Sequence, residues 1–299
     1  MIKKVLHQDI DREKYRNCLQ NAANYRVYAE DWYLDAHTDS KWDCLVYKDY
    51  EAVMPLPYLR KFGLKIIFQP IYCQQLGVFH HPNFDKNKLQ QFSEKFGQLP
   101  VYFYQLNEEN ADLNFADTKV KKNHLLPLND SYEQLRKRYR KGRKSDINSM
   151  KRRSLRISSE LQLPLLIQEL SNKYPYFTSH YEQPWFSNLL NEIISRKQFT
   201  YYQLLDGVET VSSVFFAHSK KRMILLFSTR NEKPEHRGAN SFLIDHFLQN
   251  HANQDLMLDF EGSTVPGIAD FYESFGAKAH PYHRIENSKL QLIRKIIKV

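Results

Sequence analysis

Apolar runs and helical apolar spacing alternate in a regular order through the second half of the chain. Three short apolar runs follow one another across hairpin-like turns at Asp206-Gly207 and at Ser219 to Lys221. Segments with apolar residues at 3.6-residue spacing flank these runs and predict helices. The expected elements are a strand at 155–160, helices at 164–173 and 184–196, strands at 199–205, 210–218 and 223–229, a helix at 238–251, a strand at 256–260, a helix at 267–275 and a strand near 280–286.

The first half repeats this order of elements with little letter-level similarity. Its expected elements are a strand at 2–6, helices at 12–21 and 28–36, strands at 43–47, 51–59 and 65–68, a helix at 86–96 and a strand at 100–106. A turn-like stretch from Pro127 to Ser131 separates the halves. The pattern therefore predicts an α+β fold with mixed sheets and two domains, at 1–128 and 129–299.

Composition narrows the class of protein. A chain of 299 residues with 42% hydrophobic and 26% charged residues is typical of soluble globular proteins. The N-terminus does not read as a signal peptide, and no run approaches the roughly 18 apolar residues of a membrane helix. Cys18, Cys44 and Cys73 are too few and too widely spaced for a disulfide framework or a metal knuckle. We therefore expect a reduced, cytoplasmic protein without a metal site.

Positive charge is concentrated in one segment. Arg136–Arg156 holds eleven Lys or Arg residues and a single acid, Asp146, whereas the formal charge of the whole chain is only +9. Such a segment can attract the phosphates of tRNA or another nucleic acid, of a nucleotide-linked substrate or of lipid headgroups. A solvated helix face is the alternative interpretation, with about equal weight.

The block 256–277 is the strongest candidate for a site. It reads as a buried strand, a polar loop and an amphipathic helix that ends at a glycine, and ligands of open α/β sheets bind beyond the carboxyl ends of strands. Asp259 and Glu261 alternate at the end of the strand and so share one face. Either could accept a proton from an amine, although a helix cap or an ion pair is the favoured interpretation for Asp259.

This block and its surroundings resemble a known superfamily. The order of elements resembles the GNAT (Gcn5-related N-acetyltransferase) fold, and residues 269–276, ADFYESFG, nearly match the GNAT pattern A-x-x-F-Y-E-x-x-G. The stretch 259–263, DFEGS, with Gly267, resembles the Fem-type peptidoglycan aminoacyltransferases, as does the basic stretch 139–144. The resemblance implies two tandem GNAT-like units, the first degenerate, in a bacterial branch of these proteins.

The resemblance also implies roles for particular residues. Tyr272 would protonate the leaving group of the donor, against the alternative of a core tyrosine at helical spacing. The start of helix 238–251 would bind the pyrophosphate of an acyl-CoA donor, although Glu235 and Asn240 depart from the usual loop pattern. Gln74 and Gln75 would face the acceptor, or else satisfy the backbone of their loop. The expected donor-binding residues are Ser228, Thr229, Arg237, Gly238, Ala239, Asn240 and Ser241.

The function expected from this resemblance is N-acyl transfer. The donor is an acyl-CoA, with acetyl-CoA preferred, and the acceptor is an amine. One alternative is a Fem-like transferase that uses aminoacyl-tRNA and acts on a cell-wall precursor, with the tRNA on Arg136–Arg156. Another is a non-catalytic binding protein built from decayed transferase units.

Overall fold

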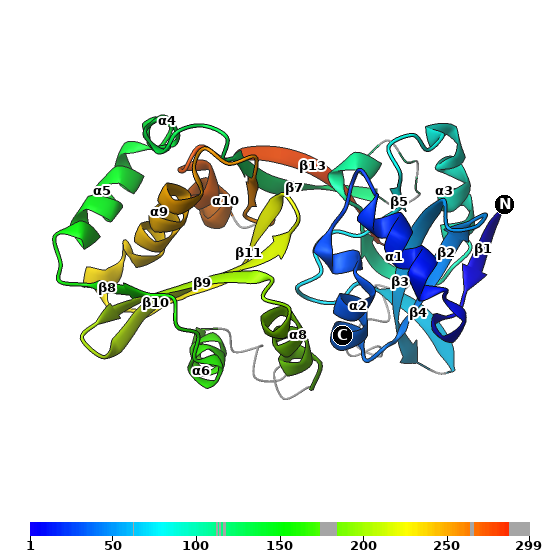
Figure 1. Cartoon of the computed structure of the whole chain (residues 1–299), viewed down its shortest axis with the longest axis horizontal. Coiled ribbons are helices and arrows are strands. Elements are labelled where there is room, and N and C mark those ends of the chain that lie inside the picture. The colour runs from blue at the N-terminus through cyan, green and yellow to red at the C-terminus, as the bar shows by residue number, and fades with distance from the viewer. Residues whose placement is uncertain are drawn as a thin grey trace. The chain divides into compact units, whose positions relative to one another are not determined.

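Two compact units make up the chain. The computed structural model describes residues 1–61, 63–111, 113, 115, 118–173, 184–263 and 266–286. One unit comprises residues 1–122 together with the segment that starts at Pro281, and the other comprises Asn123–His280. Each unit combines helices with a mixed sheet, so the α+β fold expected from the sequence is confirmed (Figure 1).

The first unit is built on an antiparallel run of strands that is extended by one parallel strand. The strands pair in the order β1 (Ile2–Val5), β2 (Trp42–Tyr47), β3 (Ala52–Lys61), β4 (Leu64–Phe68) and β6 (Val101–Gln105), and the short β5 (Phe79–His80) pairs with β3. Only the β4–β6 pair is parallel. The helices are α1 (Arg12–Gln20), α2 (Asp31–Thr38) and α3 (Gln90–Phe96). Single 3₁₀ turns precede α2 and α3, which is why both begin later than the sequence pattern predicts.

The second unit repeats the same strand order. Its strands are β8 (Arg156–Ser158), β9 (Phe199–Asp206), β10 (Glu209–Ser219), β11 (Arg222–Arg230) and β12 (Met257–Asp259). The first four are antiparallel, and β12 pairs with β11 in parallel. The helices are α4 (Tyr132–Lys137), α5 (Lys141–Lys151), α6 (Leu163–Lys173), α8 (Pro184–Ser195), α9 (Ala239–His251) and α10 (Pro266–Glu273). Every strand and helix expected at 155–286 is present.

Each unit receives its last strand from a distant part of the chain. In the first unit, the end of β13 (Lys278–Glu286) pairs antiparallel with β6, with Ile285 opposite Tyr104. In the second unit, the end of β7 (Thr118–Pro127) pairs antiparallel with β12, with Leu126 opposite Leu258. This exchange of last strands could not be predicted from the order of elements along the sequence, because it depends on pairing between distant residues.

The strand β7 corrects the sequence analysis, which expected no strand before the turn at Pro127. Its first half is polar and largely exposed, and only Asn123 to Leu126 are buried. Two of those four residues, Asn123 and His124, are polar, so the segment lacks the apolar run that marks a buried strand. The turn-like stretch does lead into a helix, because Ser131 and Gln134 form a capping box at the start of α4.

Helices cover both faces of the β9–β11 sheet. Figure 1 shows α6 and α8 on one face and α5, α9 and α10 on the other. On the α9 side, the rings of Phe216 and Phe247 stack with centroids 4.0 Å apart. Ile147 and Met150 of α5 are also buried in this core. The basic segment is thus not a free arm, since one face of α5 is packed against the unit.

Close contact between α5 and α9 depends on a glycine. Gly238 caps α9, and a Cβ atom at this position would lie 2.5 Å from the carbonyl oxygen of Asp146. The backbone of α5 cannot move away without disturbing Ile147, which is fully buried. Only glycine therefore allows the two helices to approach this closely.

We predict that Gly238→Ala lowers the free energy of unfolding by about 1–3 kcal/mol, because the added methyl group overpacks the α5–α9 contact. The matched control is Gly142→Ala on α5, where a Cβ meets nothing within 4 Å. This control should be neutral or stabilise the protein by up to about 1 kcal/mol. Urea unfolding followed by circular dichroism measures both variants, and equal effects would contradict the packing role of Gly238.

Candidate active site

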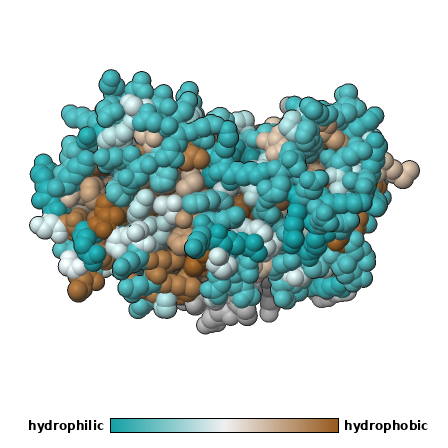
Figure 2. Space-filling model, in the orientation of Figure 1, coloured by the Kyte–Doolittle hydropathy of each residue, from teal (hydrophilic) through white to brown (hydrophobic). Residues whose placement is uncertain are grey.

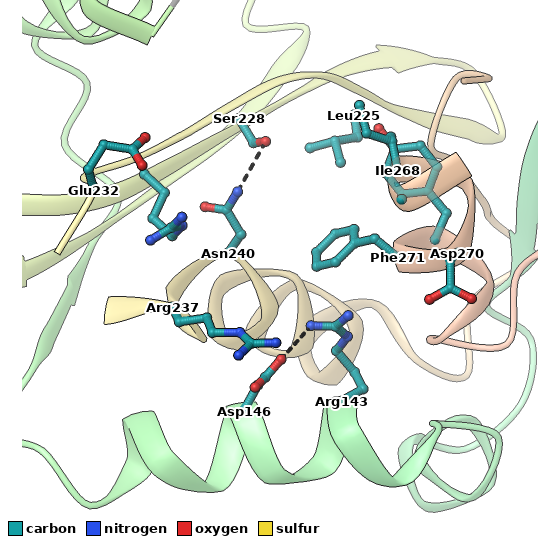
Figure 3. Close-up of a pocket in the computed structure, with 13 residues that line it drawn as sticks. Arg143, Asp146, Leu225, Ser228, Glu232, Arg237, Asn240, Ile268, Asp270 and Phe271 are labelled. Atoms are coloured by element: carbon teal, nitrogen blue, oxygen red, sulfur yellow. Dashed lines mark hydrogen bonds and ion pairs between the residues drawn. The ribbon is translucent and has the colours of Figure 1, made fainter. Parts of the chain in front are cut away.

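A cavity of about 530 Å³ opens beside the C-terminal part of β11 in the second unit. It forms because β11 and β12 pair only between Arg222–Ile224 and Met257–Asp259. The remainder of β11 continues past the end of β12, and α10 lies alongside the gap (Figure 3). The β10–β11 register shifts at the same place and leaves Leu226 as an extra residue, a bulge of the kind often found next to active sites.

Arg143 closes the floor of this cavity from α5. Its guanidinium group lies 4.3 Å from the ring centroid of Phe271 and donates hydrogen bonds to Asp146 and Ser274, each 2.8 Å long, and to Ser241. Figure 3 shows Arg143 and Asp146 facing each other beneath α9. Burial lowers the pKa of Arg143, and the nearby carboxylate of Asp146 counteracts the effect. Arg143 therefore stays a cation held between aromatic rings and polar partners.

The β11 side of the cavity is polar. Asn240, in the first turn of α9, accepts a 2.6 Å hydrogen bond from the hydroxyl of Ser212, and its amide nitrogen lies 3.4 Å from the hydroxyl of Ser228. Arg237, just before α9, is exposed, and its guanidinium has no hydrogen-bond or ion-pair partner in the described parts of the chain. The amides of the first helical turn lack intrahelical acceptors, so this corner is able to bind an anionic group.

Tyr272 forms part of the opposite wall. Its ring stacks on Phe260, with centroids 4.8 Å apart, and lies 5.8 Å from the ring of His124. The imidazole of His124 is fully buried, with Nε2 3.6 Å from the carboxylate of Glu273. The Tyr272 side chain is thus fixed by aromatic contacts at the edge of the cavity, which suits a group that must donate a proton at a defined place.

The structure brings four of the sequence-predicted residues together at this cavity, namely Ser228, Arg237, Asn240 and Tyr272. Three others support the cavity without lining it. Gly238 packs against α5, Ala239 is fully buried, and Ser241 accepts a hydrogen bond from Arg143. Thr229 lies on another surface, where its hydroxyl donates to Glu169.

The two predicted carboxylates sit at the end of β12. Asp259 is buried, forms a 2.8 Å ion pair with Arg222 and accepts the backbone N–H of Glu261. Glu261 is partly buried and has a left-handed backbone, with φ of 54°. Neither carboxylate lines the cavity as the structure describes it. Asp259 thus has the partners expected of a structural residue, and the role of Glu261 stays a prediction.

Gln74 and Gln75 belong to the first unit. Gln75 is buried, and its side-chain oxygen accepts a 3.3 Å hydrogen bond from Arg26. The backbone carbonyl of Gln74 accepts a hydrogen bond from the side chain of Gln105. The Gln75 side chain thus has a partner within the first unit, and the expected role of both glutamines toward an acceptor stays a prediction.

Several cavity residues were not anticipated from the sequence as site residues. Asp270 and Phe271 come from α10, and Arg143 and Asp146 from the basic segment. The sequence held one signal for the last two, since Asp146 is the single acid of that segment and lies three residues after Arg143. That spacing places both side chains on one face of a helix.

The exposed face of the basic segment keeps most of its charge. In the described chain, Arg138, Arg140, Arg143 and Lys151 form ion pairs with acids, whereas Arg136, Lys137, Lys141 and Lys144 form none. Figure 2 shows a hydrophilic surface over α4 and α5. An anionic partner could therefore bind this surface without first breaking ion pairs.

The described residues contain no cluster of three or more His, Cys, Asp or Glu side chains arranged to hold a metal ion. Among their helices, none has the length and apolar character needed to cross a membrane.

Comparison with known proteins identifies the fold. No protein-family model matches the chain, and no curated protein matches its sequence. The solved structure of FemX superimposes with a TM-score of 0.62 at 10% identity and covers 99% of this chain and 100% of its own. The C-terminal domain of a putative lysylphosphatidylglycerol synthetase from Agrobacterium fabrum gives 0.56 at 13% identity and covers 96% of both chains. A GNAT-family acetyltransferase from Colwellia psychrerythraea gives 0.50 at 11% identity and covers 95% of this chain and 98% of its own.

The chain therefore has a GNAT-like fold of the Fem type, as the sequence resemblance indicated. The match extends over nearly the whole chain, so it includes both units. At these identities the likeness is one of fold, and the activity must be argued from the site.

We predict that Asp259→Asn lowers the free energy of unfolding by roughly 3 kcal/mol, because it breaks a 2.8 Å ion pair between two largely buried side chains. The control is Asp255→Asn, which removes an exposed ion pair with Lys221 and should cost less than about 1 kcal/mol. Urea unfolding measures both variants. Unchanged stability in Asp259→Asn would contradict the structural role and favour a catalytic one.

Proposed function

We propose that the protein is an acyltransferase that moves an aminoacyl group from an aminoacyl-tRNA onto an amine, with Tyr272 as the proton donor. The observation that carries the proposal is the position of Tyr272 on the wall of a cavity that begins where β11 separates from β12. The volume of this cavity, about 530 Å³, suits a small acyl group. The similarity of fold to FemX over the whole chain is consistent with this activity.

The chemistry needs one proton to leave and one to arrive. The acceptor amine attacks the carbonyl carbon of the donor ester, a C–N bond forms and the C–O bond breaks. The amine loses a proton, and the leaving oxygen gains one. A phenol held at a fixed place by Phe260 can supply the second proton, as a general acid must lie within hydrogen-bond reach of the leaving atom.

Charge inside the cavity favours an aminoacyl group over a polyphosphate. Three carboxylates, those of Asp146, Glu232 and Asp270, share its walls with three arginines. Arg143 pairs with Asp146, and Arg140 from outside the cavity pairs with Asp270. With Arg140 included, four arginines face three carboxylates, so the cavity has a net charge of only about +1, which is small beside the charge of several phosphates.

Charge outside the cavity favours a large polyanion. Lys137 at the end of α4 is exposed, and the exposed Lys141 and the partly buried Lys144 lie on α5, the helix that supplies the cavity floor. A tRNA bound there would place its phosphates on the surface and only its aminoacyl end in the cavity. The names of other matched structures, which include a lysylphosphatidylglycerol synthetase, are consistent with aminoacyl transfer in general.

An acyl-CoA donor is the second candidate. It is favoured by Arg237, which lacks a partner in the described chain, and by the free first-turn amides of α9. Against it, α5 packs directly on this helix end, where a Cβ on Gly238 would lie 2.5 Å from the carbonyl oxygen of Asp146. The two donors therefore make opposite predictions for binding.

We predict that Tyr272→Phe slows acyl transfer by about 10²- to 10⁴-fold, the usual contribution of a general acid, while stability is retained. The matched control is Tyr202→Phe, a half-buried tyrosine of the same unit that packs on His246 away from the cavity. The assay mixes the protein with aminoacyl-tRNA or acyl-CoA and a panel of amines. Unchanged turnover in Tyr272→Phe would overturn the catalytic assignment, and donor binding without transfer would favour the non-catalytic alternative.

For the donor, we predict saturable tRNA binding whose logarithmic salt dependence becomes shallower by about 2 in Lys141→Gln/Lys144→Gln, because each phosphate contact contributes close to 1 to the slope. The control Lys3→Gln/Lys197→Gln removes equal charge elsewhere on the exposed surface and should keep the slope. Filter binding at several salt concentrations measures this slope. Calorimetric binding of acetyl-CoA, without binding of tRNA, would instead favour the acyl-CoA donor.

A further inference from the structure

A second cavity of about 310 Å³ lies between α6 and the ends of β10 and β11. Its walls include Glu169 and Asn172 from α6 and Asn231 from the segment after β11. None of these residues was selected from the sequence as a site residue. The volume is at the lower end of the range for small-molecule sites.

The carboxylate of Glu169 is held in one orientation by the sheet. Ser213 of β10 and Thr229 of β11 lie directly opposite each other, so their side chains share one face. Both hydroxyls donate 2.8 Å hydrogen bonds to the same oxygen, Oε2. The carboxylate is therefore preorganised without a cation.

The other oxygen of Glu169 has no donor. Oε1 is shielded from solvent and accepts no hydrogen bond in the parts of the chain that the structure describes. An acceptor screened from water and left without a donor is costly, and more so when it belongs to a carboxylate. One side of this carboxylate therefore has no compensating partner within the described chain.

The charges of the cavity define the ligand. Arg230 and Glu232, which also line it, carry opposite charges, so Glu169 gives the cavity its net negative charge. Asn172 and Asn231 add neutral polar side chains, of which the Asn231 oxygen already lies 3.0 Å from Nδ1 of His236. A primary ammonium group has three N–H donors, no acceptor and a single positive charge, which matches this wall.

We propose that this second cavity binds a ligand with a primary ammonium group, and that the carboxylate of Glu169 supplies the negative charge that attracts it. The two cavities share Arg230 and Glu232, so an amine bound here lies next to the candidate active site. Its role as the acceptor in acyl transfer rests on the proposed function, whereas its binding does not.

The test uses n-butylamine, which is a cation at pH 7, and titrates the full-length protein by calorimetry at constant ionic strength. We expect saturable binding of n-butylamine, and at least tenfold weaker binding of 1-butanol and of tetramethylammonium, which lack the charge or the N–H donors. Glu169→Gln should weaken n-butylamine binding at least tenfold, since it removes the charge and keeps the shape. The control Glu192→Gln removes an exposed carboxylate of α8 and should leave the affinity unchanged.

A second variant keeps the test decisive should Glu169→Gln fail to fold. Asn172 is exposed and lies three residues after Glu169, on the same face of α6. Asn172→Lys supplies a tethered ammonium group and should abolish n-butylamine binding while raising Tm. The proposal is overturned by non-saturable binding, by equal binding of the three probes, or by wild-type affinity in either cavity variant. If n-butylamine binds as expected but acyl transfer does not depend on Tyr272, only the proposed function is overturned.

Discussion

The guanidinium group of Arg143 joins three helices at the edge of the candidate active site. It extends from α5, bonds to Ser241 of α9 and Ser274 after α10, and lies over the rings of Phe271 and Phe275. These contacts fix α10 beside the open part of β11. Tyr272 follows Phe271 directly, so its place on the cavity wall depends on the same cation. A partly buried charge of this kind stabilises the structure only while all of its partners are present.

The two units share a strand order but use the end of the sheet differently. In the second unit the short β11–β12 pairing opens a cavity that α10 borders. In the first unit β6 is followed by a 3₁₀ turn, Glu108–Asn110, in place of such a helix. Asn107 and Asn110 bond there to the backbone of Leu76 and Val78. In the first unit, hydrogen bonds within the structure thus occupy the region that is an open cavity in the second unit. This difference is expected of a degenerate copy.

Local sequence patterns predicted the helices and strands, whereas contacts between residues far apart in the sequence determine the candidate active site. The three-stranded core of the second unit was predictable because hairpin turns and apolar runs are local signals. The strand β7 and the pairing of Asp259 with Arg222 depend on residues far apart in the sequence. For Ser228 and Thr229, the alternation of side chains along a strand could have improved the prediction of the site. Adjacent residues of a strand point to opposite faces, so the two could not share a donor site, and each lines a different cavity.

The two faces of α5 in the basic segment have different surroundings. Arg143, Asp146, Ile147 and Met150 follow the spacing i, i+3, i+4 and i+7, and this stripe faces the core and the cavity floor. Lys141 and Lys144 lie off this stripe, and neither forms an ion pair with an acid of the described chain. The interpretation of the basic segment as a solvated helix face therefore applies only to the outer face of α5. Because packing fixes the inner stripe, the outer cations are held at a constant distance from the cavity, which is the geometry that a donor with an anionic body and a small reactive end requires.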